Sequence, residues 1–133
     1  PVHLGRYRHE EKNPEIEKFS EALLKALKHE TLRSGEWQLL DPQPAWQDNP
    51  THNNFIISLW TKAGEPSFLS VANLASYQSQ CRVNLRGLKT SGTNIKLVDQ
   101  LSSTTYERST SEISESGLFL DLPRHGVHLF KIA

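Results

Sequence analysis

The sequence predicts a mainly β protein, an antiparallel β-sandwich or barrel preceded by one amphipathic α-helix. Two observations lead to this fold class. From residue 32 onward, apolar residues recur at every second position in short runs that are separated by turn residues. Before residue 32, apolar residues recur every three or four positions over one stretch only. The 133 residues are enough for one domain with an apolar core.

The helix is predicted over residues 14–28. Asn13 can accept hydrogen bonds from the free N–H groups of the first turn, and Pro14 is tolerated at the first helical position. The helix carries an apolar stripe on one face, made of Ile16, Phe19, Leu23 and Leu27. A stripe of this kind must be covered, either by the sheet of the same domain or by a neighbouring domain. We interpret it as an interdomain packing surface, and we expect no other helix in the chain.

Alternation with a period of two predicts six to eight short strands in the rest of the chain. The clearest spans residues 54–61, where Phe55, Ile57 and Leu59 share one face. Further strands are expected at residues 36–40, 68–73, 79–85, 94–99 and 106–108. Residues 41–54 are rich in proline, which cannot donate to a β-ladder, so they are expected to form a loop.

The last two strands are expected at residues 118–122 and 127–130, on either side of the turn at residues 123–126. Two alternating runs around a Pro-Arg-His-Gly turn are typical of a β-hairpin. We expect this closing hairpin to complete the sheet. Its two histidines, His125 and His128, lie in the turn and in the strand, so their side chains need not converge.

The composition argues against several kinds of partner. Fifteen basic and fifteen acidic residues give a formal net charge of zero, so no strong field is available to hold nucleic acid. No apolar run approaches the roughly 20 residues needed to cross a bilayer. The single cysteine, Cys81, cannot form an internal disulfide, and no signal peptide is visible; both favour the cytoplasm. Because the chain starts at Pro1 without methionine, we expect a piece of a longer protein.

No residue pattern predicts a catalytic or metal site, and we expect no cofactor. The six histidines lack the spacings typical of zinc ligands. Cys81 is in phase with Val83 and is expected to be a core residue rather than a nucleophile. Asp99 and Asp121 are interpreted as solvated or capping groups rather than as the paired carboxylates of a glycosidase. The fragment itself is therefore not expected to be an enzyme.

The three tryptophans are the best candidates for a binding surface, because exposed aromatic rings can stack on sugars. Trp37 and Trp60 fall in strands and are interpreted mainly as packing residues. Trp46 falls in the proline-rich loop, where packing and sugar binding are about equally expected. Trp46 and Trp60 are the candidate carbohydrate-binding residues.

Taken in order, several segments resemble the C-terminal end of bacterial α-amylase-family glycoside hydrolases of the retaining (β/α)8-barrel type. The matching segments are spread from one end of the chain to the other: residues 4–9, 13–16 with the apolar stripe, 32–37, 68–74 with its Asn73, 97–101, 117–123 and 126–130. Each motif is short, so the specificity of the resemblance comes from their order. Arg124 departs from it, because a second proline or an aromatic residue is common there.

The resemblance implies that residues 1–31, with the helix, are the end of a missing catalytic barrel. It also implies that residues 32–133 are the C-terminal domain of that protein, an antiparallel Greek-key β-sandwich. The catalytic carboxylates and calcium sites of the family would lie upstream, so no catalytic or metal-binding residue is carried over. The expected function is to stabilise the barrel of a starch- or glycogen-active hydrolase or transglycosylase, and to assist α-glucan binding. The alternatives are a carbohydrate-binding module with Trp46 and Trp60 as platforms, and a free-standing protein-interaction sandwich.

Overall fold

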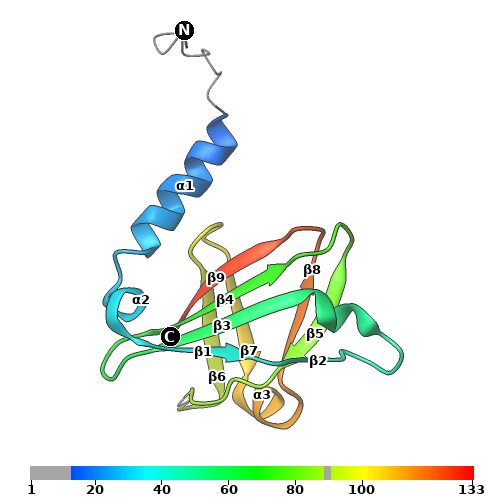
Figure 1. The fold of residues 1–133 in the computed structure, drawn as a ribbon. Helices are drawn as coiled ribbons and strands as arrows, with labels where there is room; N and C mark the ends of the chain where they lie inside the picture. Colours follow the sequence, from blue (N-terminus) through cyan, green and yellow to red (C-terminus); the bar gives the residue numbers. More distant parts are fainter. Residues whose placement is uncertain (1–12, 89–90) are drawn as a thin grey trace, which may run out of the picture.

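The computed structural model describes residues 13–88 and 91–133 of the chain (Figure 1). Its helical elements are α1 (Pro14–Ala26), α2 (Glu30–Ser34), the 3-10 helix η1 (Pro50–Asn54) and α3 (Thr110–Ser116). Its strands are β1 (Glu36–Leu40), β2 (Pro42–Gln43), β3 (Phe55–Thr61), β4 (Ser67–Asn73), β5 (Ser79–Val83), β6 (Asn94–Asp99), β7 (Thr105–Ser109), β8 (Leu118–Leu122) and β9 (Val127–Ile132). The predicted mainly β class with a leading helix is confirmed.

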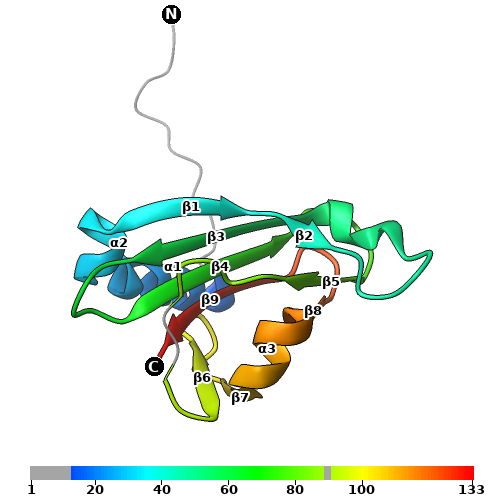
Figure 2. The same ribbon diagram turned by 90° about the horizontal axis from the view of Figure 1, so that it is seen from below.

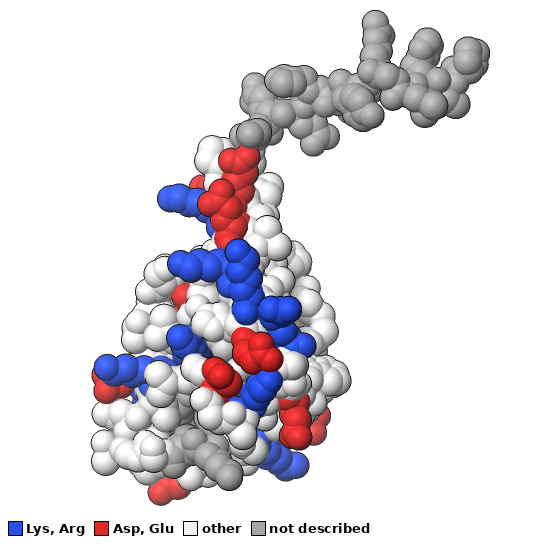
Figure 3. All heavy atoms as spheres, turned by 90° about the vertical axis from the view of Figure 1, so that its left-hand side faces the viewer, with Lys and Arg blue, Asp and Glu red and all other residues white. Residues whose placement is uncertain are grey.

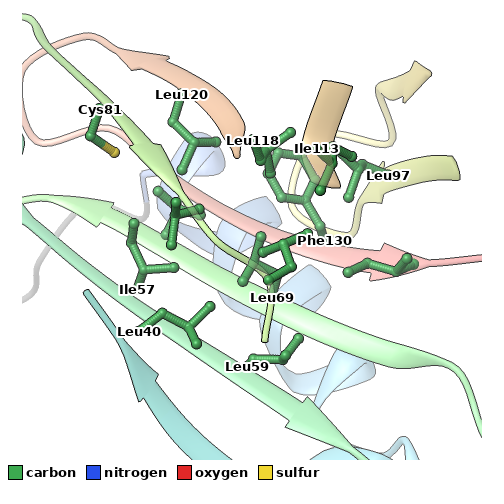
Figure 4. Packing of buried hydrophobic residues seen from close by; sticks show 14 of the residues in the cluster. Leu40, Ile57, Leu59, Leu69, Cys81, Leu97, Ile113, Leu118, Leu120 and Phe130 are labelled. Atoms are coloured by element: carbon green, nitrogen blue, oxygen red, sulfur yellow. The ribbon is translucent and has the colours of Figure 1, made fainter. Parts of the chain in front are cut away.

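The strands form two antiparallel sheets that enclose the main apolar core. The larger sheet has six strands in the order β1-β3-β4-β9-β6-β7, and the smaller has three in the order β2-β5-β8. Ile57 and Leu69 of the larger sheet belong to the same buried cluster as Leu118 and Leu120 of the smaller one (Figure 4). The alternation predicted for residues 54–61 holds, because Phe55, Ile57 and Leu59 are all buried. The finer Greek-key connectivity stays a prediction.

The predicted closing hairpin is wrong. Strand β8 pairs with β5 in the smaller sheet, with Cys81 opposite Leu120, whereas β9 pairs with β4 and β6 in the larger sheet. The turn between them is present, because the N–H of Gly126 donates to the carbonyl of Pro123 over 2.9 Å. This turn carries the chain from one sheet to the other, and β9 then lies between β4 and β6.

The expectation of a single helix is also wrong. Helix α3 forms in the Ser/Thr-rich stretch, where the hydroxyl of Ser109 accepts the N–H of Glu112 at the helix start. Its Ile113 is buried in the main core. The helix itself lies on the side of the sandwich away from β1 (Figure 2). Within residues 41–54, the structure also contains η1 and the two-residue strand β2, which pairs with β5. The burial of Ile113 and the cap from Ser109 therefore stabilise α3, although the apolar periodicity of its sequence is weak.

Candidate functional site

The main candidate site is an apolar groove between α1 and the outer face of the larger sheet. The groove has a volume of about 300 Å³. One wall is formed by Phe19 and Leu23 of α1 and by Leu27, which follows its last residue. The other wall is formed by three side chains of the sheet, Trp60, Val127 and Leu129. Almost all of these groups are apolar, so the groove is suited to contact with another apolar surface rather than to acid-base chemistry.

The sheet register shows which side chains lie on the face of the larger sheet that borders the groove. On β3, the residues between the core positions face outward, and they include Ser58 and Trp60. Ser58 lies opposite Ser70 on β4, and Ser70 lies opposite Leu129 on β9. Small serine side chains therefore occupy the middle of this face, while larger apolar side chains stand on either side.

Helix α1 begins as predicted and is attached to the sheet by its C-terminal end. The side chain of Asn13 accepts hydrogen bonds from the N–H groups of Glu15 and Ile16 at 3.0 and 3.5 Å. At the other end, Ala26 packs with Phe68 and Leu129 in a second buried cluster. The helix otherwise projects away from the sandwich (Figure 1), and acidic side chains are visible along its length, with basic ones near its base (Figure 3).

The structure separates the four predicted packing residues of α1. Phe19, Leu23 and Leu27 line the groove, and Leu23 is half-buried because it packs against the domain's own second cluster. Ile16 lies further along the projecting part of α1 and is 62% exposed. Sequence reasoning missed the opposite wall, formed by Val127 and Leu129, because their alternation was assigned to a hairpin. The groove nevertheless contains most of the predicted stripe.

The tryptophans occupy three different environments. Trp60 is half-buried and packs against the second cluster, as expected for a packing residue. Trp37 lies opposite Trp60 in the sheet but is 58% exposed, so it is not a core residue, and interdomain packing stays a prediction for it. Trp46 is 54% exposed on the loop before η1. Trp46 and Trp60 belong to opposite ends of the β3 region, so they do not form one sugar-binding platform.

Asp99 was predicted to be a solvated or capping group. It is buried rather than solvated, but its carboxylate does cap the backbone of the turn that follows β6. Its Oδ1 accepts the N–H groups of Leu101 and Leu129, and its Oδ2 accepts the Ser102 hydroxyl and lies 2.7 Å from Nδ1 of His128. Burial acts to raise the pKa of Asp99, but the four hydrogen bonds together outweigh it and hold the pKa below its usual value.

This Asp99–His128 pair is a structural clamp rather than a hydrolase triad. In a triad, the serine hydroxyl bonds to the histidine, whereas Ser102 donates to the aspartate. The His128 ring is stacked on Phe130, with 4.7 Å between ring centroids. The clamp thus joins the turn after β6 to β9. Asp121, the other aspartate considered, is exposed as expected and accepts hydrogen bonds from Gln78 and Gln80.

Cys81 is buried in the main core, as predicted from its phase with Val83. Burial raises the pKa of its thiol to about 12. We therefore expect less than about a tenth of Cys81 to react with iodoacetamide at pH 8.5 in the native protein, because the reactive thiolate is scarce and shielded. In concentrated urea the same treatment should label the thiol completely. Mass spectrometry distinguishes the labelled protein from the unlabelled one. Rapid labelling without denaturant would contradict the expectation.

Within residues 13–88 and 91–133, no group of three or more His, Cys, Asp or Glu side chains is arranged to hold a metal ion. None of the helices described is long and apolar enough to cross a membrane. Compared with known proteins, the sequence matches no family model and no curated protein. Part of the family resemblance, residues 4–9, lies outside the described residues.

Proposed function

We propose that this chain is the non-catalytic C-terminal β-sandwich domain of an α-amylase-like glycoside hydrolase, and that its groove packs against the catalytic barrel. The observation that carries the proposal is the uncovered apolar surface that continues from the stripe of α1 into the groove. The ordered sequence motifs support an α-amylase-like parent, and the exposed groove supports a contact on this side of the larger sheet. In this proposal the chemistry belongs to the barrel.

The apolar surface is large enough to stabilise a domain contact. Ile16, Phe19 and Leu27 are each more than two-fifths exposed, although they lie on one side of a single helix. Full burial of one such side chain contributes roughly 1.5–3 kcal/mol. Large contiguous apolar patches on a folded surface usually mark interaction sites. A neighbouring domain that covered α1 and the groove together would gain several such contributions.

The first test is the sequence immediately upstream of Pro1. A (β/α)8 pattern with three catalytic carboxylates in its loops is expected, and an unrelated fold there would contradict the proposal. In that longer protein, Leu27→Asp should lower the melting temperature of the barrel. Leu74→Asp is the matched control, because Leu74 is also exposed but does not line the groove. Equal effects of the two substitutions would show that the groove is not the contact.

An activity assay adds an independent check. The 133-residue chain should not hydrolyse soluble starch or a chromogenic maltoside, because the proposal places the nucleophile and the acid/base upstream. Measurable hydrolysis that survives repeated purification would contradict it.

Carbohydrate binding is a second candidate function, and the exposure of Trp46 favours it. If Trp46 stacks on a sugar ring, β-cyclodextrin or maltoheptaose should change the tryptophan fluorescence at millimolar concentrations. Trp46→Ala should abolish this response, whereas Trp37→Ala, which removes an equally exposed ring elsewhere, should preserve it. An unchanged spectrum at millimolar ligand would exclude this function.

A further inference from the structure

Strand β1 forms one outer edge of the larger sheet, because it pairs only with β3 among the strands of residues 13–88 and 91–133 (Figure 2). No strand in this described part of the chain pairs with the backbone N–H and C=O groups along its other side. An edge of this kind is complementary to another extended strand, since each new pairing satisfies a row of backbone hydrogen bonds. The edge lies outside the groove, whose lining contains no residue of β1.

The side chains of β1 do not protect this edge. Natural sheets commonly block their edges with charged residues, with proline or with very short strands. The opposite edge of the same sheet, β7, carries Glu107 and Arg108, and β2 of the smaller sheet has only two residues and begins with Pro42. In contrast, the outward-facing residues of β1 are Trp37 and Leu39, which are 58% and 59% exposed.

We propose that β1 is the site at which two copies of this chain associate, with the two β1 strands pairing antiparallel about a two-fold axis through Gln38. Antiparallel pairing about this residue places Trp37 opposite Leu39 of the second copy, and Leu39 opposite Trp37 of the second copy. Both apolar pairs then lie on the same face of one continuous sheet, with the two strands about 4.8 Å apart.

The one charged residue of β1, Glu36, is compatible with this register. Glu36 faces Leu40 of the second copy, so the two carboxylates do not oppose each other. A shift of one residue would move Trp37 and Leu39 of one copy opposite side chains that face the other side of the sheet. The self-complementary register therefore favours a second copy over an unrelated strand. This inference is independent of the proposed function, because the groove can pack against a barrel in either copy.

Size-exclusion chromatography with light scattering tests the association over about 20–500 µM protein. The mass should rise from 15.1 kDa toward twice that value as the concentration increases. Leu39→Lys should weaken association by about tenfold or more, because it removes two symmetry-related apolar pairs. Leu74→Lys is the matched control, since Leu74 is also 59% exposed, and it should leave the association unchanged.

Hydrogen exchange then identifies the surface involved. Amides of β1 should become more protected as the wild-type concentration rises, and this protection should disappear in Leu39→Lys. Trp37→Lys provides a second edge variant if Leu39→Lys does not fold. The proposal is overturned if the wild type stays monomeric across the range, as it would if the edge served a strand of another protein. It is also overturned if Val127→Lys, in the groove, abolishes association while Leu39→Lys does not.

Discussion

Replacing Asn73 with alanine is expected to lower the free energy of unfolding by about 3 kcal/mol. Asn73 is 1% exposed at the end of β4. Its amide nitrogen donates to the carbonyls of Tyr77 and Pro123, both at 2.9 Å, and to that of Leu122 at 3.3 Å. Its amide oxygen accepts the N–H of Ala75 at 3.1 Å.

The expected loss is large because these bonds hold the turn that passes between the sheets. Each hydrogen bond contributes only about 1 kcal/mol net, but alanine would remove all four at once. The carbonyls of Pro123 and Tyr77 would keep their bonds from the N–H of Gly126 and the hydroxyl of Ser79, so the expected loss comes from the four missing bonds. The turn between β8 and β9 would then lose its main side-chain link to β4, and the position of β9 in the larger sheet depends on that turn.

Urea unfolding followed by tryptophan fluorescence measures the effect. Asn53→Ala is the matched control, because Asn53 is exposed on η1 and should change the free energy by less than about 0.5 kcal/mol. Asn73→Asp adds a second comparison, since its carboxylate would face carbonyl oxygens and should destabilise at neutral pH by at least as much. If Asn73→Ala behaved like Asn53→Ala, the amide would not be what holds the turn.

Side-chain faces were predictable from the sequence, whereas strand partners were not. The alternation of Ile57 and Leu59 with Trp60 is a local property, so burial on one face follows from period two alone. The choice of sheet for β8 and β9 depends on pairings with β5 and β4, which are distant in sequence. A four-residue turn fits both a hairpin and a crossing between sheets, and local pattern does not distinguish them.

The candidate groove, like the fold, was only partly predictable from the sequence. The stripe of α1 follows from its spacing, but the second wall of the groove required knowledge of which sheet β9 joins. Asp99 illustrates the limit most clearly, because nothing in the sequence connects it to His128, which is 29 positions away. An aspartate at the end of a strand is usually solvated, and only the tertiary structure buries this one.

Asp99→Asn is expected to lower the free energy of unfolding by about 2–3 kcal/mol at pH 7. The asparagine oxygen can still accept the N–H groups of Leu101 and Leu129, which bond to Oδ1 in the wild type. The new amide nitrogen would replace Oδ2, and so it would oppose the Nδ1 of His128 in place of a charged acceptor. The variant therefore removes the charge-assisted bond while it preserves the shape of the side chain.

The free energy of unfolding that Asp99→Asn removes should depend on pH, in a direction set by the pKa of Asp99. This pKa is lowered in the folded protein from its ordinary value of 3.8, so unfolding takes up a proton in the range below that value. The stabilisation from the ionised carboxylate is complete above about pH 4 and is lost as the pH falls through the lowered folded pKa. Other carboxylates also titrate there, but they are common to both proteins and cancel in the difference.

Urea titrations of both proteins between pH 7 and about pH 2.5 test this dependence. The difference in unfolding free energy between wild type and Asp99→Asn should narrow as the pH falls below about 4, because protonated Asp99 also lacks a negative charge for His128. The control is Asp41→Asn, at an exposed aspartate, whose free energy of unfolding should differ little from that of the wild type at every pH. If the difference for Asp99→Asn stayed constant throughout, the clamp would act through shape and neutral hydrogen bonds, and its charge would contribute nothing to the stability of the fold.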